Sequence, residues 1–150
     1  MALHVREQIM VAMAAALTSL TTIGANVFRD RDTGERPLQA SEVPALVLED
    51  NGEPAETVTL GAGGIMERTM AVRVTAHVKA ASGTSAQLNL ILKEVEIALA
   101  GASLGGAKYA LLRQVGQREV SEATDLPTLR QAFDFDVLYY TARGTPDVAL

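Results

Sequence analysis

Cysteine and tryptophan are both absent from the 150-residue chain. Without cysteine it can form no disulfide, no thiolate metal site and no cysteine nucleophile. Its only histidines are His4 and His77, and a histidine metal site needs further ligands close in space. No apolar run reaches the roughly 18 residues that a membrane-spanning helix requires. We therefore expect no metal, no other cofactor and no membrane partner.

Positive charge is scarce as well. The chain has 13 basic and 18 acidic residues, which gives a net charge of −5. Residues 24–60 carry three arginines against eight acidic residues, whereas the rest of the chain has ten of each. Duplex nucleic acid is held mainly by basic patches. A tight nucleic-acid binder is therefore not expected.

The length and the apolar content indicate one globular unit. Apolar residues make up 48% of the chain and charged residues 21%, which is typical of globular domains. We expect residues 1–150 to form a single domain, with residues 143–150 as a loose tail.

Two segments show the three-and-four spacing of apolar residues that is typical of a helix with one buried face. The first covers about residues 4–23, is rich in alanine and methionine, and is followed by Gly24. The second covers about residues 86–100 and follows a turn that supplies an N-cap.

Period-two alternation of apolar and polar residues predicts strands. The clearest strand covers about residues 66–80. Other strands are expected at about residues 26–29, 45–49, 110–120 and 130–141, with a brief one at Val58 and Leu60. Because strands follow one another without regular alternation with helices, we expect an α+β fold. It would be a mostly antiparallel β-sheet with two α-helices packed on one face, as a two-layer sandwich.

The alternation also assigns residues to a polar face of the sheet. Arg73, Thr75 and His77 share one face of the long strand, and Asp134 and Asp136 share one face of the last strand. Solvent or a polar subunit interface explains such faces, and we interpret His77 as a solvated or interface histidine.

No catalytic motif stands out. The glycine-rich residues 101–109 fail as a phosphate-binding loop, because Ala107 and Tyr109 occupy positions where the motif needs lysine and a hydroxyl residue. A G-x-S-x-G nucleophile motif is also absent. We therefore do not expect an enzyme.

The order of the predicted segments and several stretches of sequence match those of a known group of proteins. The phrases are "VREQIMVAMAAALTSL", "VPALVLED", "RTMAVRVTAHV", "LNLILKEVEIALA" and "FDFDVLYYTARGTP". In this layout the chain resembles the tail terminators of long-tailed bacteriophages and prophages, a group of small minor-tail (protein U-like) and tail-completion proteins. The resemblance covers nearly the whole chain.

The resemblance implies a structural role. Such a protein is a subunit of a hexameric ring that caps the tail tube, stops its polymerisation and offers its other face to head-completion or neck proteins. DNA passes through the lumen of the ring without specific binding. The implied location is the virion tail, assembled in the bacterial host cytoplasm, and no catalytic residue carries over.

Charged loops are the expected contacts of such a ring. We predict a subunit or partner interface at Arg29, Arg31, Asp32 and Arg36. We predict an acidic rim or lumen loop at Glu49, Asp50, Glu53 and Glu56.

Two alternatives stay open. A head–tail connector or another tail-completion protein would share much of this layout. A small ligand-binding domain or enzyme would need a deep pocket that gathers polar groups from Arg73, His77 and the Asp134/Asp136 face.

Overall fold

The computed structural model describes residues 2–31, 36–53, 55–57, 63–81, 83–121 and 127–150, with only the backbone described at 55–57 and 121. It contains helices α1 (Val5–Leu17) and α2 (Thr84–Gly101) and a short 3-10 helix, η1 (Ala40–Glu42). The strands are β1 (Val27–Arg29), β2 (Ala45–Asp50), β3 (Ala55–Thr57), β4 (Ile65–Lys79), β5 (Tyr109–Val115), β6 (Glu119–Ser121), β7 (Thr128–Ala142) and β8 (Thr145–Ala149).

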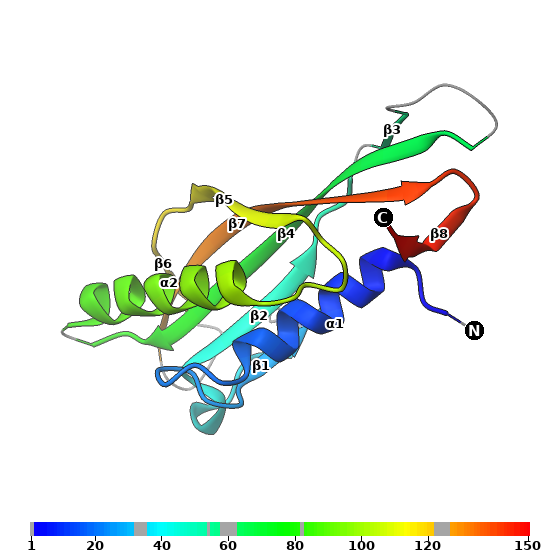
Figure 1. Ribbon diagram of the computed structural model, residues 1–150. Coiled ribbons are helices and arrows are strands. Elements are labelled where there is room, and N and C mark those ends of the chain that lie inside the picture. The colour runs from blue at the N-terminus through cyan, green and yellow to red at the C-terminus, as the bar shows by residue number, and fades with distance from the viewer. Residues whose placement is uncertain (1, 32–35, 54, 58–62, 82, 122–126) are drawn as a thin grey trace.

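In the described part of the chain, all eight strands belong to one curled sheet (Figure 1). Its main path runs β1-β2-β4-β7-β5, while β3 pairs with β4, and β6 and β8 pair with β7. The β1–β2 pair is parallel and the other pairs are antiparallel. The predicted α+β class and the mostly antiparallel sheet are confirmed. The finer description as a two-layer sandwich stays a prediction.

Strands β4 and β7 form the centre of the sheet. All 15 residues of each strand are in register with the other, from Ile65 opposite Ala142 to Lys79 opposite Thr128. Alternate residues of both strands are apolar, so the pairing puts the apolar side chains of the two strands on the same face of the sheet along most of its length.

The main core lies on that apolar face. Its cluster of buried residues joins β2, β4 and β7 to both helices, and it includes Leu46, Val74, Phe133, Val5 and Ile91. Tyr139, Phe133 and Phe135 are the largest fully buried side chains. A second cluster, Leu38, Val43 and Ala45, with Phe28 packed against it, lies where the segment before β2 meets β1.

Helix α1 ends at Leu17, before the end expected at Ile23. The Thr18 hydroxyl donates a hydrogen bond to the Ala15 carbonyl, a local bond that competes with continued helix. Leu20 and Ile23 are still buried, but in turns rather than in the helix. The periodicity therefore located the buried residues correctly and the helix end wrongly.

The C-terminus is a strand and not the loose tail expected for residues 143–150. Gly144, at φ +86°, makes the turn, and β8 then pairs with β7. The Leu150 amide continues the pairing by donating to the Tyr140 carbonyl at 2.9 Å.

The strand expected at residues 110–120 is divided into β5 and β6, with Gly116 between them. Strand β5 also contains a bulge: Leu112 lies opposite Phe135, and Gln114, not Arg113, lies opposite Asp134. The brief strand expected at Val58 and Leu60 lies outside the described residues. None of the described helices is long and apolar enough to cross a membrane.

The loop after α2 comes close to α1 at Gly105. This residue has φ +61°, and a Cβ atom there would come within 2.8 Å of the Gln8 backbone. Both the backbone conformation and the space therefore require glycine. Gly24 has a similar φ of +66° but nothing within 4 Å of an added Cβ.

These two glycines give a matched test. We expect Gly24→Ala to lower the free energy of unfolding by about 1–2 kcal/mol, the cost of a left-handed alanine. Gly105→Ala should cost about 1–3 kcal/mol more, because the methyl group must displace helix backbone. Urea unfolding measures both, and equal losses would contradict the close approach of this loop to α1.

Candidate functional site

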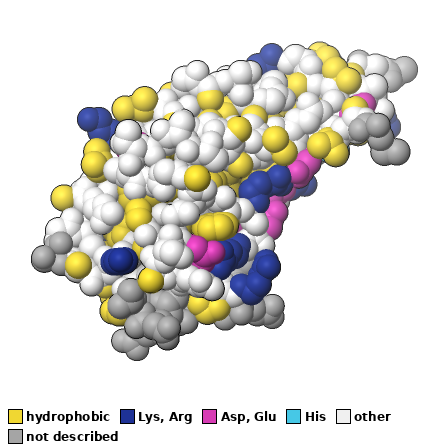
Figure 2. Space-filling model, turned by 90° about the horizontal axis from the view of Figure 1, so that it is seen from below, with side chains coloured by type: hydrophobic (Ala, Val, Ile, Leu, Met, Phe, Trp, Pro, Cys, Tyr) yellow, Lys and Arg dark blue, Asp and Glu magenta, His cyan; other side chains and the backbone are white. Residues whose placement is uncertain are grey.

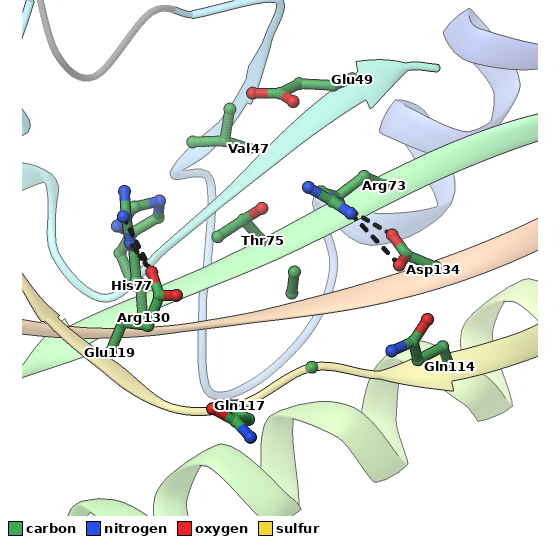
Figure 3. A pocket seen from close by; sticks show the side chains of 12 residues that line it. Val47, Glu49, Arg73, Thr75, His77, Gln114, Gln117, Glu119, Arg130 and Asp134 are labelled. Atoms are coloured by element: carbon green, nitrogen blue, oxygen red, sulfur yellow. Dashed lines mark hydrogen bonds and ion pairs between the residues drawn. The ribbon is translucent and has the colours of Figure 1, made fainter. Parts of the chain in front are cut away.

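A polar hollow of about 350 Å³ lies on the face of the sheet opposite the main core (Figure 3). Strands β2, β4 and β7, and the segment from β5 to β6, contribute side chains to it. The register arranges these side chains in three rows that cross the sheet. Rows two residues apart are about 6.7 Å apart, so the outer rows are about 13 Å apart.

The first outer row is strongly charged. Glu49, Arg73, Asp134 and Gln114 lie opposite one another on four neighbouring strands. Arg73 donates to both oxygens of Asp134, from Nε at 2.8 Å and from the second nitrogen at 3.4 Å. This hydrogen bond raises the pKa of Arg73. Asp134 is nearly buried, with 8% of its side chain exposed.

The other outer row contains His77, Arg130 and Glu119, again in register across their strands. Arg130 pairs with Glu119, with the Nε atom 3.0 Å from the carboxylate. Both members of this pair are exposed to solvent, so the pair contributes little to stability.

The row between them consists of small side chains. Val47 lies opposite Thr75, and Thr75 opposite Ala132. Gly116 extends the row by donating its amide to the Ala132 carbonyl at 2.8 Å. The hollow exists because this row of short side chains lies between two rows of long ones.

His77 is buried, with 4% of its surface exposed. Of the two expected environments, solvent is therefore wrong, and a subunit interface stays a prediction. Its neighbours in the row are Ala45, which is buried, and Arg130. Burial, and to a lesser degree the positive charge of Arg130, lower the pKa of His77 to about 4. The imidazole is therefore neutral at pH 7, with one nitrogen able to donate and one able to accept a hydrogen bond.

The predicted interface arginines are held mainly by their own chain. Arg29 makes two hydrogen bonds to Glu7 of α1, at 2.8 and 2.9 Å. Arg31 makes two to Glu42 at 2.9 and 3.0 Å, and its guanidinium lies 4.7 Å from the centre of the Phe28 ring.

Arg36 differs from these two arginines because its side chain is exposed and makes no hydrogen bond or ion pair to any described residue. Asp32, the fourth predicted interface residue, lies outside the described residues. Of the four, Arg36 is thus the one that the described structure leaves open to a partner.

The predicted acidic loop is divided between separate environments. Glu49 lies in the hollow, and Asp50 pairs with Arg6 of α1. Glu53 has only 5% of its side chain exposed, so it presents no carboxylate to a channel. The side chain of Glu56 lies outside the described residues.

Glu53 belongs to an ionic cluster that the sequence reading missed. It accepts hydrogen bonds from the Tyr139 hydroxyl at 2.7 and 2.9 Å and from Arg68 at 3.0 Å. Burial, and then the bond to Glu53, raise the pKa of Tyr139. The available signal was Tyr139 itself, because a tyrosine at a core position of an alternating strand needs a partner for its hydroxyl.

Charge on the surface is correspondingly mixed. Figure 2 shows basic and acidic side chains next to one another on the face seen from below, not a large patch of one sign. The described residues also contain no group of three or more histidine, aspartate or glutamate side chains placed to hold a metal ion.

Comparisons with known proteins do not assign the chain to a family. No protein-family model matches it, and neither does any curated protein. Among solved structures it is similar to a chain in the virion of a native gene transfer agent (GTA) particle. That match has a TM-score of 0.43 and 19% sequence identity, and it covers 91% of this chain and 95% of the other.

The burial of His77 predicts a pH dependence of stability. The unfolded chain binds a proton to His77 below about pH 6.5, whereas the folded chain does so only near pH 4. Stability should therefore fall as the pH falls through this window, by about 3 kcal/mol in total.

Urea unfolding between pH 7.5 and pH 5 measures this fall before most carboxylates titrate. His77→Gln removes the titrating group and should make the dependence clearly shallower. If the wild type and this variant have the same slope, His77 is not buried as a neutral imidazole.

Proposed function

We propose that this protein is a structural subunit of a phage or prophage tail, a tail terminator. Copies of it would form a ring that caps the tail tube, ends its polymerisation and joins it to the head. The proposal is supported by the resemblance in segment order and phrases, and by the α+β fold with a mostly antiparallel sheet.

The observation that carries the proposal is the outer edge of β5. This strand ends the main path of the sheet, and its outer edge has no partner strand among the described residues. Tyr109, Leu111 and Val115 of this strand are exposed. An apolar edge strand invites pairing or packing with another chain, which suits a subunit that works only when assembled.

Two other functions remain as alternatives. A head–tail connector or another tail-completion protein would use the same exposed edge. A small ligand-binding domain or enzyme is favoured by one specific observation, because Arg73, His77 and Asp134 do line one hollow. Asp136 does not join them and instead pairs with Arg113 at 3.4 Å.

Tube assembly with the tail-tube protein of the same phage or prophage tests the proposal. We expect a ring-sized species by light scattering at high concentration, and tubes whose ends are capped and whose growth stops, as seen by electron microscopy.

Leu111→Lys should abolish the ring without unfolding the protomer. Ile97→Lys, on the exposed surface of α2, is the matched control and should leave assembly intact. A strict monomer that neither binds nor caps tubes would refute the terminator role.

The arginines of the predicted interface give a second test. Arg36→Glu should weaken assembly while leaving the unfolding midpoint unchanged, because its exposed side chain makes no hydrogen bond or ion pair to a described residue. Arg31→Glu should lower the unfolding midpoint, because it places a carboxylate against Glu42 and removes the bidentate pair. Urea unfolding and light scattering separate the two effects, and normal assembly of the Arg36 variant would exclude this loop as a contact.

A further inference from the structure

We propose that the polar hollow binds the guanidinium or ammonium group of a basic side chain that a second copy of this chain supplies. The inference rests on the proposed ring for its occupant, and on the geometry of the hollow for its chemistry.

The lining of the hollow carries a net charge of −1, because it contains three carboxylates and two arginines. Glu49 lies opposite Arg73 and interacts with its charge. Arg73 is hydrogen-bonded to Asp134, and Arg130 to Glu119. Glu49 is the third carboxylate of the lining, and it has no hydrogen bond or ion pair to any described residue. An ionised carboxylate can only accept hydrogen bonds, so a group that satisfies Glu49 must donate them.

A second acceptor lies on the far side of the hollow. His77 is 4% exposed, and no hydrogen bond joins its ring to a described residue. Figure 3 shows its ring and the Glu49 carboxylate on the same side of the sheet, with Thr75 between them. Since the ring has no hydrogen bond to a described residue, one of its nitrogens can accept a hydrogen bond from a bound donor.

The size of the hollow suits one side chain. Its volume is about 350 Å³, and its floor includes the apolar groups of Val47, Thr75 and Ala132. The aliphatic stem of a lysine or arginine can lie on such groups while its charged end reaches the carboxylate.

The same chain carries suitable donors elsewhere on its surface. Lys93, Lys108 and Arg143 are exposed, have no ion pair within the described residues, and do not line the hollow. A contact between one of them and the hollow of another copy joins two different surfaces. Such head-to-tail contacts generate rings when the rotation closes, as the proposed function requires.

Probe binding tests the chemistry without any partner. Ethylguanidinium and n-butylammonium are titrated into the protein while the imidazole signals of His77 are followed by NMR. We expect saturable shifts in the wild type and affinity weakened about tenfold in Glu49→Gln, which removes a charge-assisted hydrogen bond. Glu96→Gln makes the same charge change on the exposed surface of α2 and should bind like the wild type. The absence of His77 shifts, or equal affinities in all three proteins, would overturn the cation site.

Charge exchange tests the occupant. Glu49→Lys should reduce the ring-sized species at least tenfold in light scattering, with circular dichroism checking that the variant is folded. A second charge reversal is then added to Glu49→Lys, at Lys93, Lys108 or Arg143 in turn. The ring should return when the reversed residue is the one that enters the hollow. If Glu49→Lys assembles normally, the second copy is not the occupant, although the terminator proposal survives. A wild type that binds the probe at His77 but never assembles would overturn the ring and leave the cation site supported.

Discussion

The antiparallel pairing of β4 with β7 is the interaction on which the rest of the structure depends. Strands β2 and β3 attach to β4, strands β5, β6 and β8 attach to β7, and β1 attaches to β2. Because the side-chain period of a strand is two, slipping β7 by one residue against β4 would put the apolar residues of one strand beside the polar residues of the other. The core under the helices and the polar hollow would then be lost together.

The two faces of this ladder differ in how much they contribute to the stability of the fold. On one face, Val74 opposite Phe133 belongs to the core, where burial supplies most of the stability. On the other face, Arg73 opposite Asp134 is an ion pair whose arginine is partly exposed to solvent, and such pairs add little to stability. The ion pairs of the hollow therefore contribute less to folding than the core on the other face.

The sequence predicted what strict alternation controls. It placed Arg73 and His77 on one face of β4. It also placed Asp134 on the face of β7 that points away from Phe133 and Phe135, and the structure confirms both assignments. It did not predict the burial of His77 or the Glu53–Tyr139 bond, because both depend on residues distant in the sequence. It also could not show that Arg29 and Arg31 are held by Glu7 and Glu42, since a charged loop looks the same whether its partner is internal or external.

The bulge in β5 shows how the length of a strand governs the composition of a surface. The extra residue, Arg113, moves Gln114 onto the polar face and into line with Asp134. If the same residues paired without the bulge, Arg113 would lie opposite Asp134 and Gln114 opposite Phe133. A change in the pairing of β5 alone could thus recharge the hollow without any substitution, so sequences of this kind should be aligned by strand phase and not by residue identity alone.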